Sequence, residues 1–110
     1  SEFQELTFLN YNFPGKSNYQ YVVAHVSSDI RDSLVDYFHA HSILLRRYFH
    51  PGCHRMEPYA SHEQYKGLHL SNTEKISSEV LVFPTGTQVT PSTIKEFSNH
   101  YRKFKKANKI

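Results

Sequence analysis

The chain has 110 residues, of which 38% are hydrophobic and 21% are charged, and this length supports one domain across residues 1–110. Thirteen basic and ten acidic residues give a net charge of +3 at pH 7, which is a weaker excess than a nucleic-acid-binding domain carries. One cysteine excludes an internal disulfide, and neither a membrane-spanning stretch nor a secretion signal is expected.

The first part of the chain predicts a loop, a strand and a helix. Residues 10–18 are rich in Asn, Pro, Gly and Ser, which favour turns, and they predict a loop after an irregular N-terminal segment. Residues 19–26 are β-branched and aromatic, which predicts a half-buried strand. Ser28 is expected to cap the following helix. The residues expected on its buried face are Ile30, Leu34, Tyr37 and Phe38.

Residues 43–49 predict a second strand, which ends at Pro51 and Gly52. In such a strand Arg46 and Arg47 point to opposite faces, so only one of them faces a given cleft. An arginine at this place can hold a carboxylate or a diphosphate, and a surface ion pair is an equal alternative. The irregular residues 50–70 follow, and such loops on a rigid scaffold often carry binding residues.

The last part of the chain predicts two helices and a short strand. Ser71 and Glu74 match a capping box at the start of a short helix, and residues 81–84 predict a strand. Thr90 is expected to cap the final helix. The apolar stripe expected on that helix is Ile94, Phe97, Tyr101 and Phe104. The strand–helix–strand order fits a parallel unit or a small mixed sheet.

Reactive side chains give no strong signal by their spacing alone. Eight histidines show no zinc-ligand spacing, so we expect no metal site. Cys53 and His54 are adjacent, and adjacent side chains rarely point to one place, so a nucleophilic pair is not expected. The basic residues 102–106 favour a solvated helix end over a phosphate contact.

Five segments occur in an order that is typical of one enzyme family: residues 17–23, 30–34, 45–59, 73–84 and 90–104. Together they resemble the C-terminal part of the pyridoxal-phosphate-dependent nucleotide-sugar aminotransferases of the DegT/DnrJ/StrS family. The most specific segment is RRYFHPGCHRMEPY, which begins at Arg46. It is most similar to the branch that aminates carbon 4 of a dTDP-4-keto-6-deoxyhexose.

The resemblance implies an α+β fold, a small and mainly antiparallel sheet with helices on one face. This is the C-terminal small domain of a fold type I enzyme. In that family the Schiff-base lysine and most ligands of pyridoxal 5'-phosphate lie in a large domain, which this chain lacks. The resemblance therefore implies that no residue here is catalytic, that the chain alone does not bind the cofactor, and that it is inactive alone.

For the full-length enzyme, the resemblance implies transfer of an amino group from glutamate to a 4-keto-6-deoxy nucleotide sugar. Such enzymes are cytoplasmic homodimers that make amino sugars for lipopolysaccharide O-antigens or antibiotics. The substrate-binding candidates in this chain are Gln20, Arg47, Tyr48, His50 and His54. Gln20 stands where many relatives carry histidine.

A free-standing binding or interaction module without catalysis is the alternative reading. Such a module is expected to have a complete core, whereas a fragment of an enzyme exposes an apolar patch where the large domain docks. Nucleic-acid binding is supported only by the mildly basic charge balance.

Overall fold

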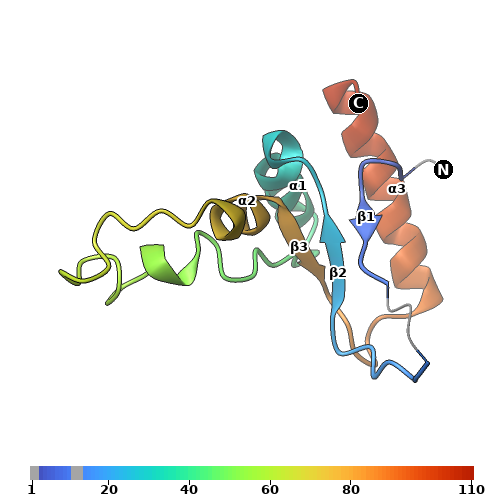
Figure 1. Cartoon of the computed structure of the whole chain (residues 1–110). Coiled ribbons are helices and arrows are strands. Elements are labelled where there is room, and N and C mark those ends of the chain that lie inside the picture. Colours follow the sequence, from blue (N-terminus) through green and yellow to red (C-terminus); the bar gives the residue numbers. More distant parts are fainter. Residues whose placement is uncertain (1–2, 11–13) are drawn as a thin grey trace.

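The computed structural model describes residues 3–10 and 14–110, and these form an α+β domain built on an antiparallel sheet (Figure 1). The sheet has three strands in the order β1-β2-β3, which are Thr7–Phe8, Val22–His25 and Val80–Phe83. The helices are α1 (Ser28–Ala40), α2 (Ser71–Glu79) and α3 (Pro91–Asn108), with one 3-10 turn at Cys53–Arg55. The predicted fold class is therefore confirmed.

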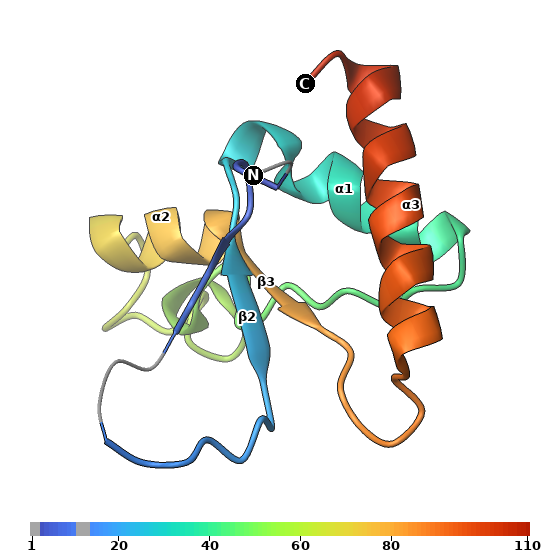
Figure 2. The ribbon, with the colours of Figure 1, turned by 90° about the vertical axis from the view of Figure 1, so that its right-hand side faces the viewer.

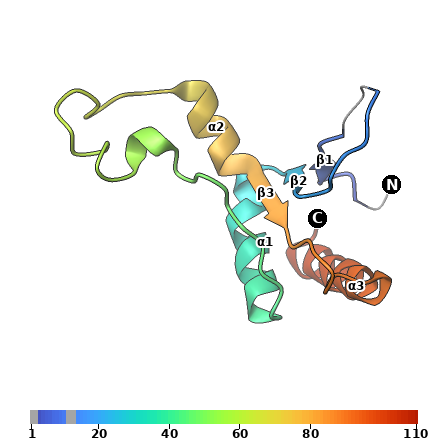
Figure 3. The ribbon, with the colours of Figure 1, turned by 90° about the horizontal axis from the view of Figure 1, so that it is seen from below.

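The register of β2 and β3 divides the sheet into two faces. Ala24 lies opposite Leu81, and Val23 lies opposite Val82. Because side chains alternate along a strand, Ala24 and Leu81 point to one face and their neighbours to the other. Ala24 and Leu81 are fully buried, and α1 and α3 lie together on that side of the sheet (Figure 3).

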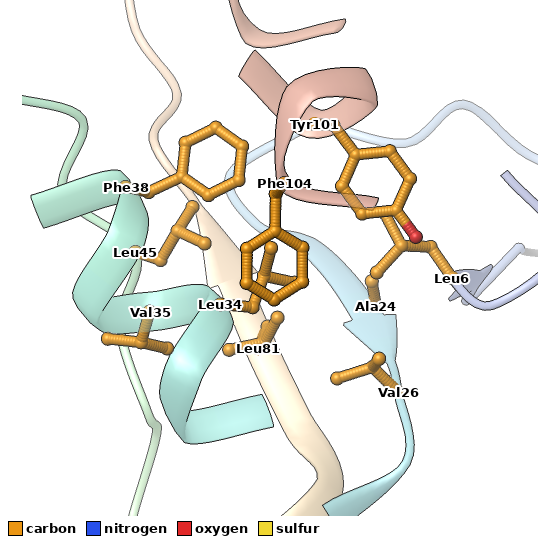
Figure 4. Packing of buried hydrophobic residues seen from close by; sticks show 10 residues of the cluster. All are labelled: Leu6, Ala24, Val26, Leu34, Val35, Phe38, Leu45, Leu81, Tyr101 and Phe104. Carbon is orange, nitrogen blue, oxygen red and sulfur yellow. The ribbon is translucent and has the colours of Figure 1, made fainter. Parts of the chain in front are cut away.

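The core fills the space between the sheet and helices α1 and α3 (Figure 4). Its members come from the sheet, from α1 and α3 and from the segments beside them: Leu6, Ala24, Val26, Leu34, Val35, Phe38, Leu45, Leu81, Tyr101 and Phe104. Each large apolar side chain buried here stabilises the fold by about 1.5–3 kcal/mol. The core thus covers one face of the sheet.

The buried face of α1 differs from the expected one, because it contains a charged residue. Arg31 is 1% exposed and lies in line with three apolar residues, Leu34, Val35 and Phe38. The Arg31 Nη1 atom donates to the carbonyl oxygens of Ser77 at 2.7 Å and Val80 at 3.2 Å. The guanidinium therefore joins α1 to the junction of α2 and β3, which Figure 2 shows as one continuous run of chain.

Two of the predicted helix caps are wrong by one residue, and one is confirmed. Ser27, not Ser28, caps α1, because its hydroxyl accepts from the Asp29 amide. In α2 the expected capping box is absent, since Ser71 is already helical and Leu70 precedes it without a side-chain cap. Thr90 caps α3 as predicted, and Pro91 is the first helical residue.

The predicted strands fit less well. Residues 43–49 form no strand, and only Arg46 pairs with β3, through two backbone hydrogen bonds of 2.9–3.0 Å to Val82. The short strand β1 was not predicted, because two residues carry no periodic signal. Residues 11–13 of the predicted loop lie outside the described part of the chain. Within that part, no helix is long and apolar enough to cross a membrane.

Residues 50–70 form an arm that extends away from the sheet and from α3 (Figures 1 and 3). The radius of gyration, 16.1 Å, accordingly exceeds the value of about 13 Å for a compact domain of this length. Glu74 on α2 holds both ends of the arm. Its Oε1 atom pairs with His54 and Arg55 from the first end and with His69 from the second.

Acid is expected to destabilise the domain through Glu5, which joins the N-terminal segment to α3. Its carboxylate accepts hydrogen bonds from Lys105 Nζ at 2.9 Å and from the Tyr101 hydroxyl at 3.2 Å. The hydrogen bond from Lys105 is the main reason that the pKa of Glu5 is lowered. A carboxyl whose pKa is lower in the folded than in the unfolded protein stabilises the fold at a pH above its unfolded-state pKa. This contribution is lost as the pH falls through its folded-state pKa.

Glu5→Gln is therefore expected to lower the free energy of unfolding at pH 7 and to flatten its decline between about pH 5 and pH 3. Urea unfolding at several pH values measures both effects. Glu63→Gln removes the same charge from an exposed position on the arm and serves as the matched control. An acid decline of Glu5→Gln parallel to that of the wild type contradicts this role.

Candidate functional site

A polar cavity of about 310 Å³ lies at the edge of the sheet where Arg46 joins β3. It is lined by residues from the start of β2, the segment 44–48 and the end of β3, which are Gln20, Tyr21, Leu44, Arg46, Tyr48, Val82, Phe83, Pro84 and Thr85. Tyr21 and Val82 belong to the sheet face that α1 and α3 leave open, because they alternate with residues of the core.

Two tyrosines form the centre of this cavity. The rings of Tyr21 and Tyr48 meet edge to face, with centroids 5.5 Å apart, and their hydroxyl groups share a hydrogen bond of 3.5 Å. The Thr85 hydroxyl donates to the Gln20 carbonyl at 3.0 Å and fixes the start of β2 against the end of β3. Residues far apart in the sequence are thus held around one space.

The electrostatics of the cavity are set by phenols and one cation. The hydrogen bond with Tyr48 is the main cause that raises the pKa of Tyr21, and the nearby Arg46 guanidinium opposes it. None of the residues that line the cavity is acidic. The arrangement offers N–H and O–H donors to a ligand and no anionic group, so it suits the recognition of hydroxyl, carboxylate or phosphate oxygens.

The five sequence-predicted residues fall into two groups. Gln20 and Tyr48 line the polar cavity. Arg47 does not line it, because its Nη1 atom pairs with Asp32 on α1 at 3.2 Å. Burial opposes ionisation of Asp32, yet the hydrogen bonds from Arg31 and Arg47 prevail and lower its pKa.

The two predicted histidines lie deeper, at the base of the arm. His50 Nδ1 lies 3.2 Å from both Arg31 Nη2 and the Ser77 carbonyl. His54 is 8% exposed, and its Nε2 atom lies 3.4 Å from Glu74 Oε1. Although burial raises it, the pKa of Glu74 is lowered on balance, chiefly by the His54 hydrogen bond and the Arg55 charge. Both imidazoles therefore hold the loop in place within this domain.

Sequence reasoning missed two residues of the site, Tyr21 and Arg46. Tyr21 was assigned only to the body of a strand, and Arg47 was chosen as the candidate in place of Arg46. The sequence carries no periodic signal for them, because Tyr48 already lies in the turn that follows Arg46.

A second cavity, of about 370 Å³, is apolar and lies between β1, the end of β3 and α3. It is lined by Phe8, Tyr19, Val22, Ile43, Phe83, Pro84, Thr85, Gly86, Val89, Thr93, Ile94 and Phe97. Ile94, which was predicted to belong to the buried stripe of α3, is 58% exposed here. Phe8 and Tyr19 also expose much of their rings. This is the kind of surface that the fragment reading predicts.

The site residues do not fit pyridoxal phosphate as a covalently held cofactor. That cofactor needs a lysine amine, and no lysine lines either cavity. In the described part of the chain, no three His, Cys, Asp or Glu side chains lie together in a way that suits a metal ion.

Known proteins share both sequence and fold with this chain. The sequence model of the DegT/DnrJ/EryC1/StrS aminotransferase family matches residues 1–101. The structure of DesI, solved in the presence of its TDP-sugar product, is 27% identical with a TM-score of 0.77, over 93% of this chain and 26% of DesI. No curated protein matches the chain.

The aminotransferase TlmJ from Streptoalloteichus hindustanus supports the fold. It is 16% identical with a TM-score of 0.71, and the match covers 97% of this chain and 28% of TlmJ. The chain thus spans about a quarter of the length of these two solved structures.

Proposed function

The chain belongs to the DegT/DnrJ/EryC1/StrS aminotransferase family, and from this premise we propose that it is the C-terminal small domain of a longer, pyridoxal-phosphate-dependent enzyme. The match of the family model over residues 1–101 is the observation that carries the proposal. The whole enzyme would transfer an amino group from glutamate to a 4-keto-6-deoxy nucleotide sugar. DesI, described with a TDP-sugar product, supports a nucleotide sugar as substrate.

The domain's part in that reaction is to close one side of the substrate site, while a large domain of the same polypeptide holds the cofactor. We assign ligand contact to Gln20 and Tyr48, because both line the polar cavity. Arg47, His50 and His54 contribute by holding the loop that carries Tyr48, through Asp32, Ser77 and Glu74. The enzyme would act as a cytoplasmic homodimer in the synthesis of amino sugars for an O-antigen or an antibiotic.

The experiment compares the polypeptide of the whole reading frame with the 110-residue chain. The whole polypeptide is expected to convert a dTDP-4-keto-6-deoxyhexose and glutamate into the 4-amino sugar nucleotide, observed by mass spectrometry. The isolated chain is expected to be inactive. After incubation with pyridoxal phosphate it is expected to show no absorption band that survives dialysis and disappears with borohydride.

Two outcomes contradict the proposal. One is a reading frame that codes for this chain alone, which favours the free-standing binding module. The other is a whole polypeptide that retains pyridoxal phosphate but transfers no amino group to any nucleotide sugar.

A further inference from the structure

Arg46 differs from its neighbouring arginines in what surrounds it. Arg31 and Arg47 both pair with Asp32, and Arg55 pairs with Glu74. Arg46 forms no ion pair with any carboxylate in the described residues. A guanidinium with five donors is thus left open to solvent beside the polar cavity.

The backbone of Arg46 is held more firmly than its exposure suggests. Its N–H and carbonyl groups both pair with Val82, so the residue lies at a fixed position on the edge of β3. The side chain that leaves this position lines the cavity together with Gln20 and Tyr48. Because the base of the side chain is fixed, less freedom is lost when the guanidinium binds a ligand.

The donors around this cavity converge without an acidic partner. The Tyr48 hydroxyl donates to the Tyr21 hydroxyl at 3.5 Å, and Gln20 and Arg46 line the same cavity around this pair. An arginine that faces amide and phenol donors without a carboxylate provides a site for an anionic oxygen group.

We propose that Arg46 binds the carboxylate or phosphate group of a ligand in the polar cavity, with Gln20 and Tyr48 as hydrogen-bonding partners of the same group. The identity of the ligand rests on the proposed function, because glutamate and the diphosphate of a nucleotide sugar are the two anions which that reaction brings to the domain. Arg46, rather than Arg47, is then the arginine that faces the substrate.

The test uses the isotopically labelled 110-residue chain and three probes, namely inorganic phosphate, glutamate and thymidine diphosphate. Each is titrated at constant ionic strength while NMR follows the Arg46 Nε–H and Gln20 side-chain amide signals. At least one probe is expected to give saturable shifts of both signals. Tighter binding of thymidine diphosphate than of the other two assigns the site to the sugar nucleotide, and tighter binding of glutamate assigns it to the amino donor.

Arg46→Gln is expected to weaken the binding by at least about tenfold, the usual loss for a hydrogen bond to a charged group. Arg102→Gln removes the same charge from an exposed position on α3 and is expected to change the affinity by less than about twofold. Arg46→Lys keeps the charge without the planar donor group, so it is expected to bind with intermediate affinity. It also tests the site if Arg46→Gln fails to fold.

The proposal is overturned if none of the probes gives a saturable shift up to about 50 mM, or if Arg46→Gln and Arg46→Lys both bind as tightly as the wild type. Amino transfer by the whole enzyme together with an unchanged Arg46→Gln titration removes this site but leaves the proposed function. Anion binding at Arg46 in a protein without aminotransferase activity supports this site and contradicts the proposed function.

Discussion

Arg31→Met is expected to lower the free energy of unfolding by about 3 kcal/mol, because it leaves two carbonyl groups at the α2–β3 junction without their donor. The methionine keeps most of the apolar stem, so the loss reports on the guanidinium rather than on packing. That guanidinium is fully buried and holds the carbonyl oxygens of Ser77 and Val80. Urea unfolding followed by circular dichroism measures the change.

Arg47→Met is the control for this substitution. Arg47 also pairs with Asp32, but its side chain is 41% exposed, so the expected loss is about 0–1 kcal/mol. If the two variants unfold at the same urea concentration, the buried hydrogen bonds of Arg31 do not hold the junction together.

Gly52→Ala is expected to destabilise the domain by about 2–4 kcal/mol, because it combines backbone strain with a collision. Gly52 has φ +111°, a conformation that residues with a Cβ rarely adopt. An added Cβ would lie 2.8 Å from His54 Cε1 and 2.9 Å from His54 Nδ1. His54 is buried between this backbone and Glu74, so the ring has little room to move.

Gly86→Ala separates the two causes. Gly86 has φ +122°, and nothing lies within 4 Å of the position that its Cβ would take, so only the backbone strain of about 1–3 kcal/mol is expected. The double variant Gly52→Ala with His54→Ala is expected to be less destabilised than the sum of the two single variants. Equal losses for Gly52→Ala and Gly86→Ala would show that the imidazole does not restrict this loop.

The parts of the fold that the sequence predicted well are those with local causes. Thr90 and Pro91 start α3 because a hydroxyl cap and a fixed proline φ act within one turn. The segment 43–49 was predicted wrongly, because apolar content alone does not say whether a sheet edge is available to pair with it. Only Arg46 meets β3 there.

The buried face of α1 was predicted incompletely, because Leu34 and Phe38 are buried and Ile30 and Tyr37 pack against the core as expected, but Arg31 was missed. Only apolar residues were used to predict this face, so a buried arginine was not considered. The partners of Arg31 are 46 and 49 residues away in the sequence, and no local pattern indicates them. The only available signal was the position of Arg31, which lies three, four and seven residues before Leu34, Val35 and Phe38.

The five substrate-binding residues chosen from the sequence stay a prediction, and the structure shows where each of them lies. Gln20 and Tyr48 were selected separately and lie around one cavity. Arg47, His50 and His54 were selected for the chemistry of their side chains, and that chemistry is used within the domain, on Asp32, Ser77 and Glu74. Side-chain type alone does not distinguish a group that holds a loop from one that holds a ligand.

The attachment of the arm makes its length independent of the packing of the core. Both ends of the arm meet at Glu74, while the residues between them extend away from the body of the domain. Insertions or deletions between residues 60 and 68 therefore change the reach of the arm without altering the core or the polar cavity, because none of these residues belongs to either. Changes in the length or sequence of this segment alter the surface that the arm presents and leave the packing of the core in place.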